Sequence, residues 1–185
     1  AFAGWDKSIP KTMPAENITR TAQWNAIFKL SENGDTITGL TDYGKNKYTE
    51  IVIPAEIDGV KITSIGDYAF YNCSGLTSIT IPNGVTSIGD YAFQGCSRLT
   101  SITIPDSVKS IGRSAFFLCS EITSITIGKS VKSIGNSVFC KCEKLTRIVF
   151  KGTTTQWYAF RIGGEWKYRV PSSCKIYCTD GTISI

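Results

Sequence analysis

The chain has 185 residues, of which 42% are hydrophobic and 19% are charged, with a net charge of +5 and no histidine. The lack of histidine excludes Ser-His-Asp and Cys-His nucleophilic systems and also His-ligated metal sites. No segment approaches the roughly 20 consecutive apolar residues of a membrane span, so we expect no insertion into a membrane.

The first ordered elements are expected near residue 28. Apolar residues in segments 28–30 and 36–40 flank Asn33-Gly34, which is a strong signal for a two-stranded hairpin. Ile51-Val52-Ile53-Pro54 then opens a 28-residue unit that carries five extra residues around 56–61, where we expect a bulging loop. We assign residues 26–60 to an N-terminal cap with an irregular first repeat.

A 23-residue repeat follows. The dipeptide Ile-Gly recurs at 65–66, 88–89, 111–112 and 134–135, and residues 76–98 and 99–121 match at 15 of 23 positions. Self-similarity at such a period predicts a solenoid, with residues 61–145 as its regular part and 146–185 as a C-terminal cap. The same step separates three further sets: Phe70, Phe93, Phe116, Phe139; Cys73, Cys96, Cys119, Cys142; and Leu76, Leu99, Ile122, Leu145.

Each copy contains two extended pieces and a turn. In residues 99–105, Ile102 and Ile104 alternate with Thr103, which predicts a strand with one buried face that ends at Pro105. A shorter extended piece covers 108–112, and 114–119 are expected to form one or two helical turns. One copy cannot bury its own apolar face, but stacked copies can, with equivalent strands about 4.8 Å apart. The sequence therefore predicts a right-handed solenoid of short parallel strands and short helical turns.

Small hydroxyl side chains occupy the outward positions of the longer strands. They form a flat, hydroxyl-rich face that the fourth copy breaks with Arg147 and Val149. We take this face as one candidate binding surface, made of Ser78, Thr80, Ser101, Thr103, Ser124, Thr126 and Arg147.

The run Leu-Thr-Ser-Ile-Thr-Ile-Pro, followed by Val-x-Ser-Ile-Gly, Ala-Phe and Cys, resembles the BspA-like class of leucine-rich repeats over about residues 36–150. The ending from Gly152-Thr153 to Thr182 resembles the usual close of such arrays. Residues 1–24, with Phe2-x-Gly4-Trp5, resemble the tail of a Listeria–Bacteroides repeat. We therefore expect residues 1–25 to be the tail of a small β module and 26–185 to be the leucine-rich-repeat domain.

This resemblance implies a secreted or wall-attached bacterial protein that binds host or bacterial surface proteins. Its repeat motif is structural, so it implies no ligand-binding residue, cofactor or metal. The first residues carry no signal-peptide pattern, and a secretion signal is expected to lie outside this chain. No nucleic-acid fold signature is present, and a monomer is favoured.

The regularly spaced cysteines are expected to be buried free thiols, because structural zinc sites usually pair cysteines two to four residues apart. Disulfide geometry along a parallel stack would also be strained. Cys140, Cys174 and Cys178 fall outside the ladder, and a Cys140–Cys174 disulfide is the candidate pairing for a secreted protein. The alternative is that all seven thiols are free.

Aromatic and basic residues gather near the C-terminus, in the half of the chain with 13 Lys/Arg and 5 Asp/Glu. Trp157, Arg161 and Trp166 form the second candidate binding site, although such residues also suit a C-terminal cap. Two exposed, coplanar tryptophans would favour a carbohydrate-binding module. Adhesion or protein binding without enzyme activity is the main prediction, with an architectural spacer and carbohydrate binding as alternatives.

Overall fold

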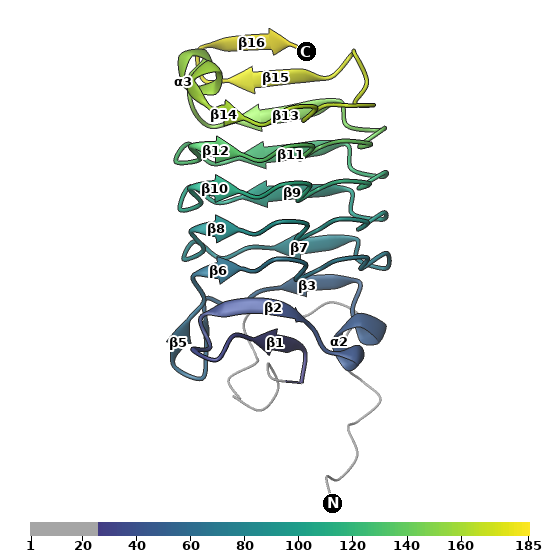
Figure 1. Cartoon of the computed structure of the whole chain (residues 1–185), viewed down its shortest axis with the longest axis vertical. Coiled ribbons are helices and arrows are strands. Elements are labelled where there is room, and N and C mark those ends of the chain that lie inside the picture. Colours follow the sequence, from purple (N-terminus) through teal and green to yellow (C-terminus); the bar gives the residue numbers. More distant parts are fainter. Residues whose placement is uncertain (1–25) are drawn as a thin grey trace, which may run out of the picture.

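The structure, a computed structural model, describes residues 26–185, apart from the side chains of Asn46 and Arg161. Residues 1–25, predicted to be the tail of a β module, lie outside the described residues. The described chain forms a solenoid whose coils stack from the N-terminal hairpin to the C-terminal strand β16 (Figure 1). Each coil contributes one longer and one shorter strand, as the two extended pieces of the repeat predicted.

The shorter strands form one seven-stranded sheet. Its order is β1-β2-β6-β8-β10-β12-β14, and every pair is parallel except the β1–β2 hairpin. Within the regular coils serine pairs with serine and isoleucine with isoleucine, as in Ser110↔Ser133 and Ile111↔Ile134. The strands are Phe28–Leu30, Thr36–Leu40, Ser64–Ile65, Ser87–Ile88, Ser110–Ile111, Ser133–Ile134 and Arg161–Ile162.

The longer strands form the opposite side of each coil. β3 (Glu50–Val52) pairs with β7 (Ser78–Thr80) as a separate two-stranded sheet. A five-stranded sheet follows, in the order β16-β15-β13-β11-β9. The hydrogen-bonded ladder is thus interrupted between β7 and β9. The strands of the second sheet are β9 Ser101–Ile104, β11 Ser124–Ile127, β13 Arg147–Phe150, β15 Lys175–Cys178 and β16 Gly181–Ser184.

The corner expected to contain helical turns is built instead from hydrogen-bonded tight turns. Each turn holds two residues with left-handed backbone, four positions apart, such as Ser114 (φ 51°) and Leu118 (φ 60°). A regular right-handed helix cannot contain such residues, because the left-handed region costs roughly 1–2 kcal/mol per non-glycine residue. The pairs recur as Tyr68/Asn72, Tyr91/Gly95, Ser114/Leu118, Ser137/Lys141 and Glu165/Arg169.

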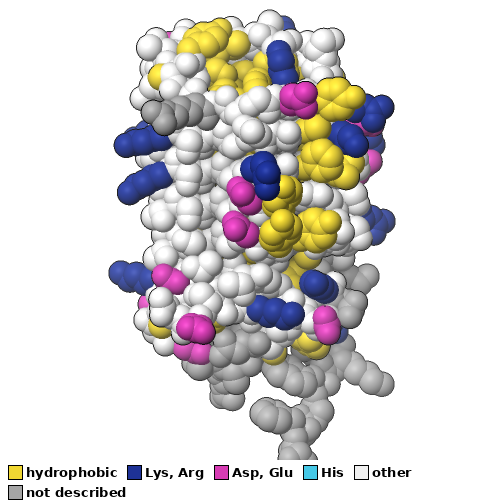
Figure 2. Space-filling model, viewed as in Figure 1, with side chains coloured by type: hydrophobic (Ala, Val, Ile, Leu, Met, Phe, Trp, Pro, Cys, Tyr) yellow, Lys and Arg dark blue, Asp and Glu magenta, His cyan; other side chains and the backbone are white. Residues whose placement is uncertain are grey.

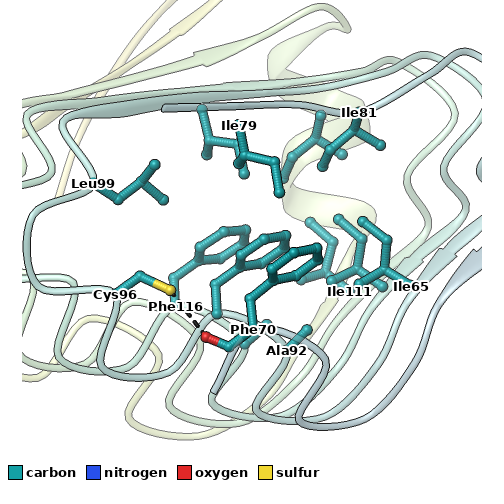
Figure 3. Packing of buried hydrophobic residues seen from close by; sticks show 14 of the residues in the cluster. Ile65, Phe70, Ile79, Ile81, Ala92, Cys96, Leu99, Ile111 and Phe116 are labelled. Atoms are coloured by element: carbon teal, nitrogen blue, oxygen red, sulfur yellow. Dashed lines mark hydrogen bonds between the residues drawn. The ribbon is translucent and has the colours of Figure 1, made fainter. Parts of the chain in front are cut away.

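Ladders of identical side chains fill the core. Phe70 and Phe93 stack with ring centroids 5.1 Å apart, and Phe93 and Phe116 with centroids 5.3 Å apart (Figure 3). Each cysteine of the ladder after the first donates its thiol proton to a phenylalanine carbonyl of the preceding coil, as Cys96 does to Phe70 over 3.1 Å. Burial of these rings and thiols supplies the main favourable free energy of stacking.

The coils at the two ends differ from those between them. Ile37 pairs with Ile65 and Ile134 with Ile162, so both end coils have a 28-residue step in place of the 23-residue step. In both, the extra residues lie between the longer and the shorter strand, on the same side of the stack (Figure 1). The N-terminal insertion is a hairpin of β4 (Glu56–Ile57) and β5 (Val60–Lys61), and the C-terminal one contains helix α3 (Thr154–Ala159).

The predicted C-terminal cap therefore contains a further coil. β14 extends the sheet of shorter strands and β15 the sheet of longer strands, before β16 closes the array with an antiparallel pair. Trp166 takes the backbone place of Val138, because its carbonyl accepts from Phe139 N–H as the Val138 carbonyl accepts from Phe116 N–H. Its ring meets Phe139 edge-on and ends the phenylalanine stack. At the other end, α2 (Asp42–Lys47) is capped by the Thr41 side chain.

Candidate binding surfaces

The predicted hydroxyl face lies on the longer strands with the expected alignment. Ser124 pairs with Ser101 and Thr126 with Thr103, and the alternating isoleucines are buried. Across the interruption of the ladder, the surface forms a shallow hollow of about 810 Å³. Among the residues that line this hydroxyl hollow are Ser78, Thr80, Asn83, Ser101, Thr103, Asp106, Ser107 and Lys151. Four of the six predicted Ser/Thr positions therefore lie together in one depression.

Charged residues border the hydroxyl face toward the C-terminus. Lys151 Nζ lies 3.8 Å from Asp106 Oδ1 at the hollow. Arg147 stands beside Ser124, and its guanidinium lies 4.3 Å from the centre of the Tyr177 ring. The break predicted at the fourth copy is thus a change from small hydroxyl groups to a guanidinium stacked on an aromatic ring. The hollow itself offers hydroxyl, amide, carboxylate and ammonium groups as donors and acceptors.

In the second predicted site, Trp157 lies in the interior and not on the surface. Trp157 is only 3% exposed, and it packs against Phe150, Phe160 and Trp166 beneath the end of the solenoid. Trp166 is half-buried, and the planes of the two indole rings meet at 67°. The two exposed, coplanar tryptophans that the carbohydrate-binding alternative requires are therefore absent from this pair, because Trp157 is buried and the rings are not coplanar. Arg161 lies in β14, and its side chain is outside the described part of the structure.

All seven cysteines are free, so the candidate Cys140–Cys174 disulfide is not formed in the structure. Cys174 is instead buried just before β15, where the pairing of Lys175 with Arg147 places it level with Thr146, and its N–H donates to the Pro171 carbonyl. The prediction of buried free thiols in the ladder is confirmed. Burial raises the pKa of Cys142 to about 12 and that of Cys174 to about 11, so both remain protonated near neutral pH.

A third surface was not selected from the sequence. We call it the aromatic turn face, and it consists of Tyr68, Tyr71, Tyr91, Phe117 and Leu118 at the tight turns. Tyr68 is 53% exposed, and Tyr71 and Leu118 are each 40% exposed. Figure 2 shows hydrophobic side chains gathered over the middle coils of this side, next to acidic and basic groups. Contiguous exposed apolar patches on a monomeric protein often mark interaction sites.

Ring contacts hold the aromatic turn face in place. Tyr68 and Tyr91 stack with centroids 4.8 Å apart and planes 15° apart, and Tyr71 meets Tyr68 edge-on at 5.6 Å. The Arg113 guanidinium lies 4.9 Å from the centre of the Tyr91 ring. Because these contacts are made before any ligand binds, little side-chain entropy is lost on binding. The sequence signal was the 23-residue step from Tyr68 to Tyr91, which places two tyrosines side by side.

The acidic groups next to the aromatic turn face have a structural role. Asp67 Oδ1 accepts a hydrogen bond from Asp90 N–H over 2.7 Å, and Asp90 Oδ1 accepts one from Arg113 N–H over 2.6 Å. Each carboxylate therefore ties its coil to the next. Within residues 26–185, no group of three or more Cys, Asp or Glu side chains is placed to hold a metal ion.

Stacked 23-residue coils, one face of short parallel strands and a phenylalanine ladder together define a leucine-rich-repeat solenoid. Comparison of the sequence with family models also identifies leucine-rich repeats. Six copies of the BspA type leucine rich repeat region match residues 41–166. The chain belongs to this family, as its repeat pattern indicated.

Solved structures of bacterial proteins share the fold. A leucine-rich repeat protein of T. pallidum is 28% identical, with a TM-score of 0.59, over 83% of this chain and 62% of that chain. A leucine rich cell surface protein of Faecalibacterium prausnitzii is 32% identical, with a TM-score of 0.53, over 80% and 42%. The pneumococcal vaccine antigen PcpA is 21% identical, with a TM-score of 0.66, over 86% and 38%, and supports the fold alone.

The chain spans less than two thirds of each of these three structures. A search of the curated proteins returned no match. None of the helices in the described part of the chain has the length and apolar character needed to cross a membrane.

Proposed function

We propose that this domain is a non-enzymatic binding module of a bacterial surface protein, and that it binds a protein ligand through the aromatic turn face. The observation that carries the proposal is the gathering of three tyrosines on one side of the solenoid: Tyr68 and Tyr71 are exposed, Tyr91 is half-buried, and the Tyr68 ring packs against the other two. A surface location agrees with the similarity to the leucine rich cell surface protein of Faecalibacterium prausnitzii.

Tyrosine and arginine are the side chains that most often carry binding energy at protein interfaces. Tyr91 stands between the Tyr68 ring and the Arg113 guanidinium, so the centre of the patch combines both residue types. Farther along the stack, Lys141 Nζ lies 5.3 Å from the centre of the Phe117 ring. An apolar centre with a charged border is the arrangement of a typical protein-binding surface.

The small-side-chain hydroxyl face supports a second candidate, the architectural spacer. Ser101 and Thr103 present only hydroxyl groups, and such a surface suits a segment that holds other modules apart. A pure spacer, however, has no use for packed and exposed tyrosines, which increase the risk of aggregation. The two candidates therefore predict different consequences for substitutions at the tyrosines.

The experiment measures binding of the domain to immobilised fibronectin, fibrinogen, laminin and collagen, which represent host matrix proteins. The test variant carries Tyr68→Ser and Tyr91→Ser, and the control carries Ser101→Ala and Thr103→Ala on the hydroxyl face. An interface hot spot contributes about 2 kcal/mol or more. We therefore expect the tyrosine variant to bind at least about thirtyfold more weakly. The control should bind as the parent does.

Circular dichroism and thermal unfolding of both variants establish that the solenoid is intact. Loss of binding in the hydroxyl-face variant alone would move the site to the hydroxyl hollow. Absence of binding to all four matrix proteins would contradict a matrix adhesin and favour the spacer.

A further inference from the structure

A second concave surface lies where helix α3 meets the regular coils, on residues outside the aromatic turn face. We call it the lysine notch. It measures about 550 Å³, and its lining consists of Lys109, Lys129, Ser130, Val131, Lys132, Gln156, Ala159 and Phe160. Basic side chains project from the corresponding left-hand edge in Figure 2, at the level of β10 and β12. Three lysines and no carboxylate therefore line one depression.

The fold does not require lysine at these positions. Backbone bonds from Lys109 N–H to the Thr86 carbonyl and from Lys132 N–H to the Lys109 carbonyl, both 2.8 Å, show that Lys109 and Lys132 are equivalent. Earlier coils fill the same position with Thr63 and Thr86, which bond to each other in the same way. Like charges opposite each other on neighbouring strands are destabilising. Two stacked lysines at this position therefore lower the stability of the fold, whereas two threonines would not.

No acidic partner neutralises the notch. The ion pairs within residues 26–185 join Lys144 to Glu121, Lys151 to Asp106 and Arg169 to Glu143, and none includes a lysine of the notch. Asp106 accepts the backbone N–H of Lys129 over 3.2 Å, and its side chain pairs with Lys151 and not with a lysine of the notch. The three ammonium groups therefore remain available to an external anion.

Helix α3 provides a fixed wall on one side of the notch. The Gln156 side-chain oxygen accepts from Thr153 N–H over 2.9 Å, and this capping box leaves the Gln156 NH₂ group as a donor. Asp180 holds the start of the helix through Thr154 N–H, and buried Trp157 anchors its middle. Ala159 and Phe160 add apolar surface beside the lysines.

From this juxtaposition we propose that the lysine notch binds an anionic polysaccharide that runs along the solenoid axis, with Lys109 and Lys132 contacting acidic groups one coil apart. Lysine suits separated anionic groups because its ammonium is a compact point charge, whereas arginine favours bidentate contacts. The Gln156 amide is placed to bind a sugar hydroxyl, and Phe160 with Ala159 offers apolar contact to the C–H face of a sugar ring. The acidic groups are sulfates or carboxylates.

The experiment measures affinity for heparin, as a sulfated chain, and for polygalacturonate, as a carboxylated chain, with neutral dextran for comparison. We expect binding to at least one of the two anionic chains and none to dextran. The tighter of the two identifies the acidic group. Binding through three lysines should weaken at least about tenfold when NaCl rises from about 50 to about 200 mM.

The test variant carries Lys109→Gln and Lys132→Gln. The matched control carries Lys167→Gln and Lys175→Gln, two exposed lysines outside the notch that lower the net charge equally. We expect the notch variant to bind at least about tenfold more weakly, because two of its three ammonium groups are lost. The control should lose less than about twofold. The notch variant should unfold at the same temperature as the parent or higher, because the stacked charges are gone.

Equal losses in the two variants would overturn the proposal, since net charge alone would then explain binding. Retention of full affinity in the notch variant would overturn it as well. Polyglutamate and inorganic polyphosphate serve as anions without a sugar ring. Either anion could bind as tightly as the polysaccharides and with the same dependence on Lys109 and Lys132. In that case the notch recognises negative charge without a sugar ring, and the assignment to a polysaccharide is wrong.

Discussion

The regular coils and the two end coils of this solenoid serve different purposes. In the regular coils, the side chains that recur at the 23-residue step, such as Phe93 and Phe116, are buried and hold neighbouring coils together. The end coils have a 28-residue step, and their extra residues form the β4–β5 hairpin and helix α3 at equivalent corners. The periodic positions therefore stabilise the stack, whereas the insertions shape its surface without disturbing the ladders.

The largest expected effect distinguishes a central from a terminal aromatic. Phe93→Ala should lower the free energy of unfolding by about 3–5 kcal/mol, because it removes a fully buried ring with a partner on each side. Trp157→Ala should destabilise the C-terminal coil by a similar free energy. The regular coils should stay folded, because solenoid coils contact only their neighbours. Hydrogen exchange separates the two outcomes. Loss of protection in residues 61–145 of the Trp157 variant would contradict this distinction.

A second prediction concerns how closely the regular coils approach each other. A Cβ at Gly112 would lie 2.5 Å from the backbone N of Asp90, whereas a Cβ at Gly75 meets nothing within 4 Å. Gly112→Ala should therefore lower the denaturation midpoint and cost about 1–3 kcal/mol. Gly75→Ala, the control, should change stability by less than about 0.5 kcal/mol. Equal losses of stability in the two variants would mean that the close backbone contact between coils does not restrict the side chain at Gly112.

A smaller loss of stability is expected from a substitution at the N-cap of α3, in the C-terminal insertion. Thr153 caps α3, accepting from Gln156 N–H over 3.2 Å. Thr153→Ala should cost about 1 kcal/mol and raise hydrogen exchange mainly in α3. Thr153→Ser retains the hydroxyl and serves as the control. If the alanine variant destabilises the central coils equally, the insertion is more tightly coupled to the ladders than its position indicates.

A further prediction concerns the stability of the folded state at alkaline pH. Burial raises the pKa of Cys142 to about 12 from an ordinary value of 9.0, so the folded state keeps a proton that the unfolded chain loses. Stability from this thiol is complete below pH 9 and declines as the pH rises toward 12. Urea unfolding at pH 8 and pH 10 measures the decline, which Cys142→Ala should reduce.

Thiol labelling provides a direct check on the same comparison. Cys178 in the last coil is half-buried, whereas Cys96, Cys119 and Cys142 of the ladder are buried. An alkylating reagent applied to the folded protein without reductant should modify Cys178 first and the ladder only after unfolding. Rapid labelling of Cys119 would contradict the close packing of the regular coils. A disulfide found between Cys140 and Cys174 would contradict the free thiols of the structure.

Within the regular coils, the sequence determined nearly all of the architecture. A 23-residue repeat can bury its apolar positions only by stacking in register, so Ile111 must pair with Ile134 and Phe93 must lie on Phe116. The N-terminal hairpin followed from Asn33-Gly34 in the same local way. The hairpin at 56–61 carried its own signal in Asp58-Gly59, whose backbone is left-handed at both residues.

The tertiary structure decided where the repeat ends and which surfaces form. The last coil was hidden because it follows a 28-residue step and because Trp166 replaces the usual small residue. Trp157 is buried because α3 folds its indole onto Phe150. The lysine notch joins Lys109 to Gln156, which are far apart in the sequence. Periodicity specifies contacts between equivalent positions, whereas contacts between an insertion and the coils beside it depend on how the insertion folds.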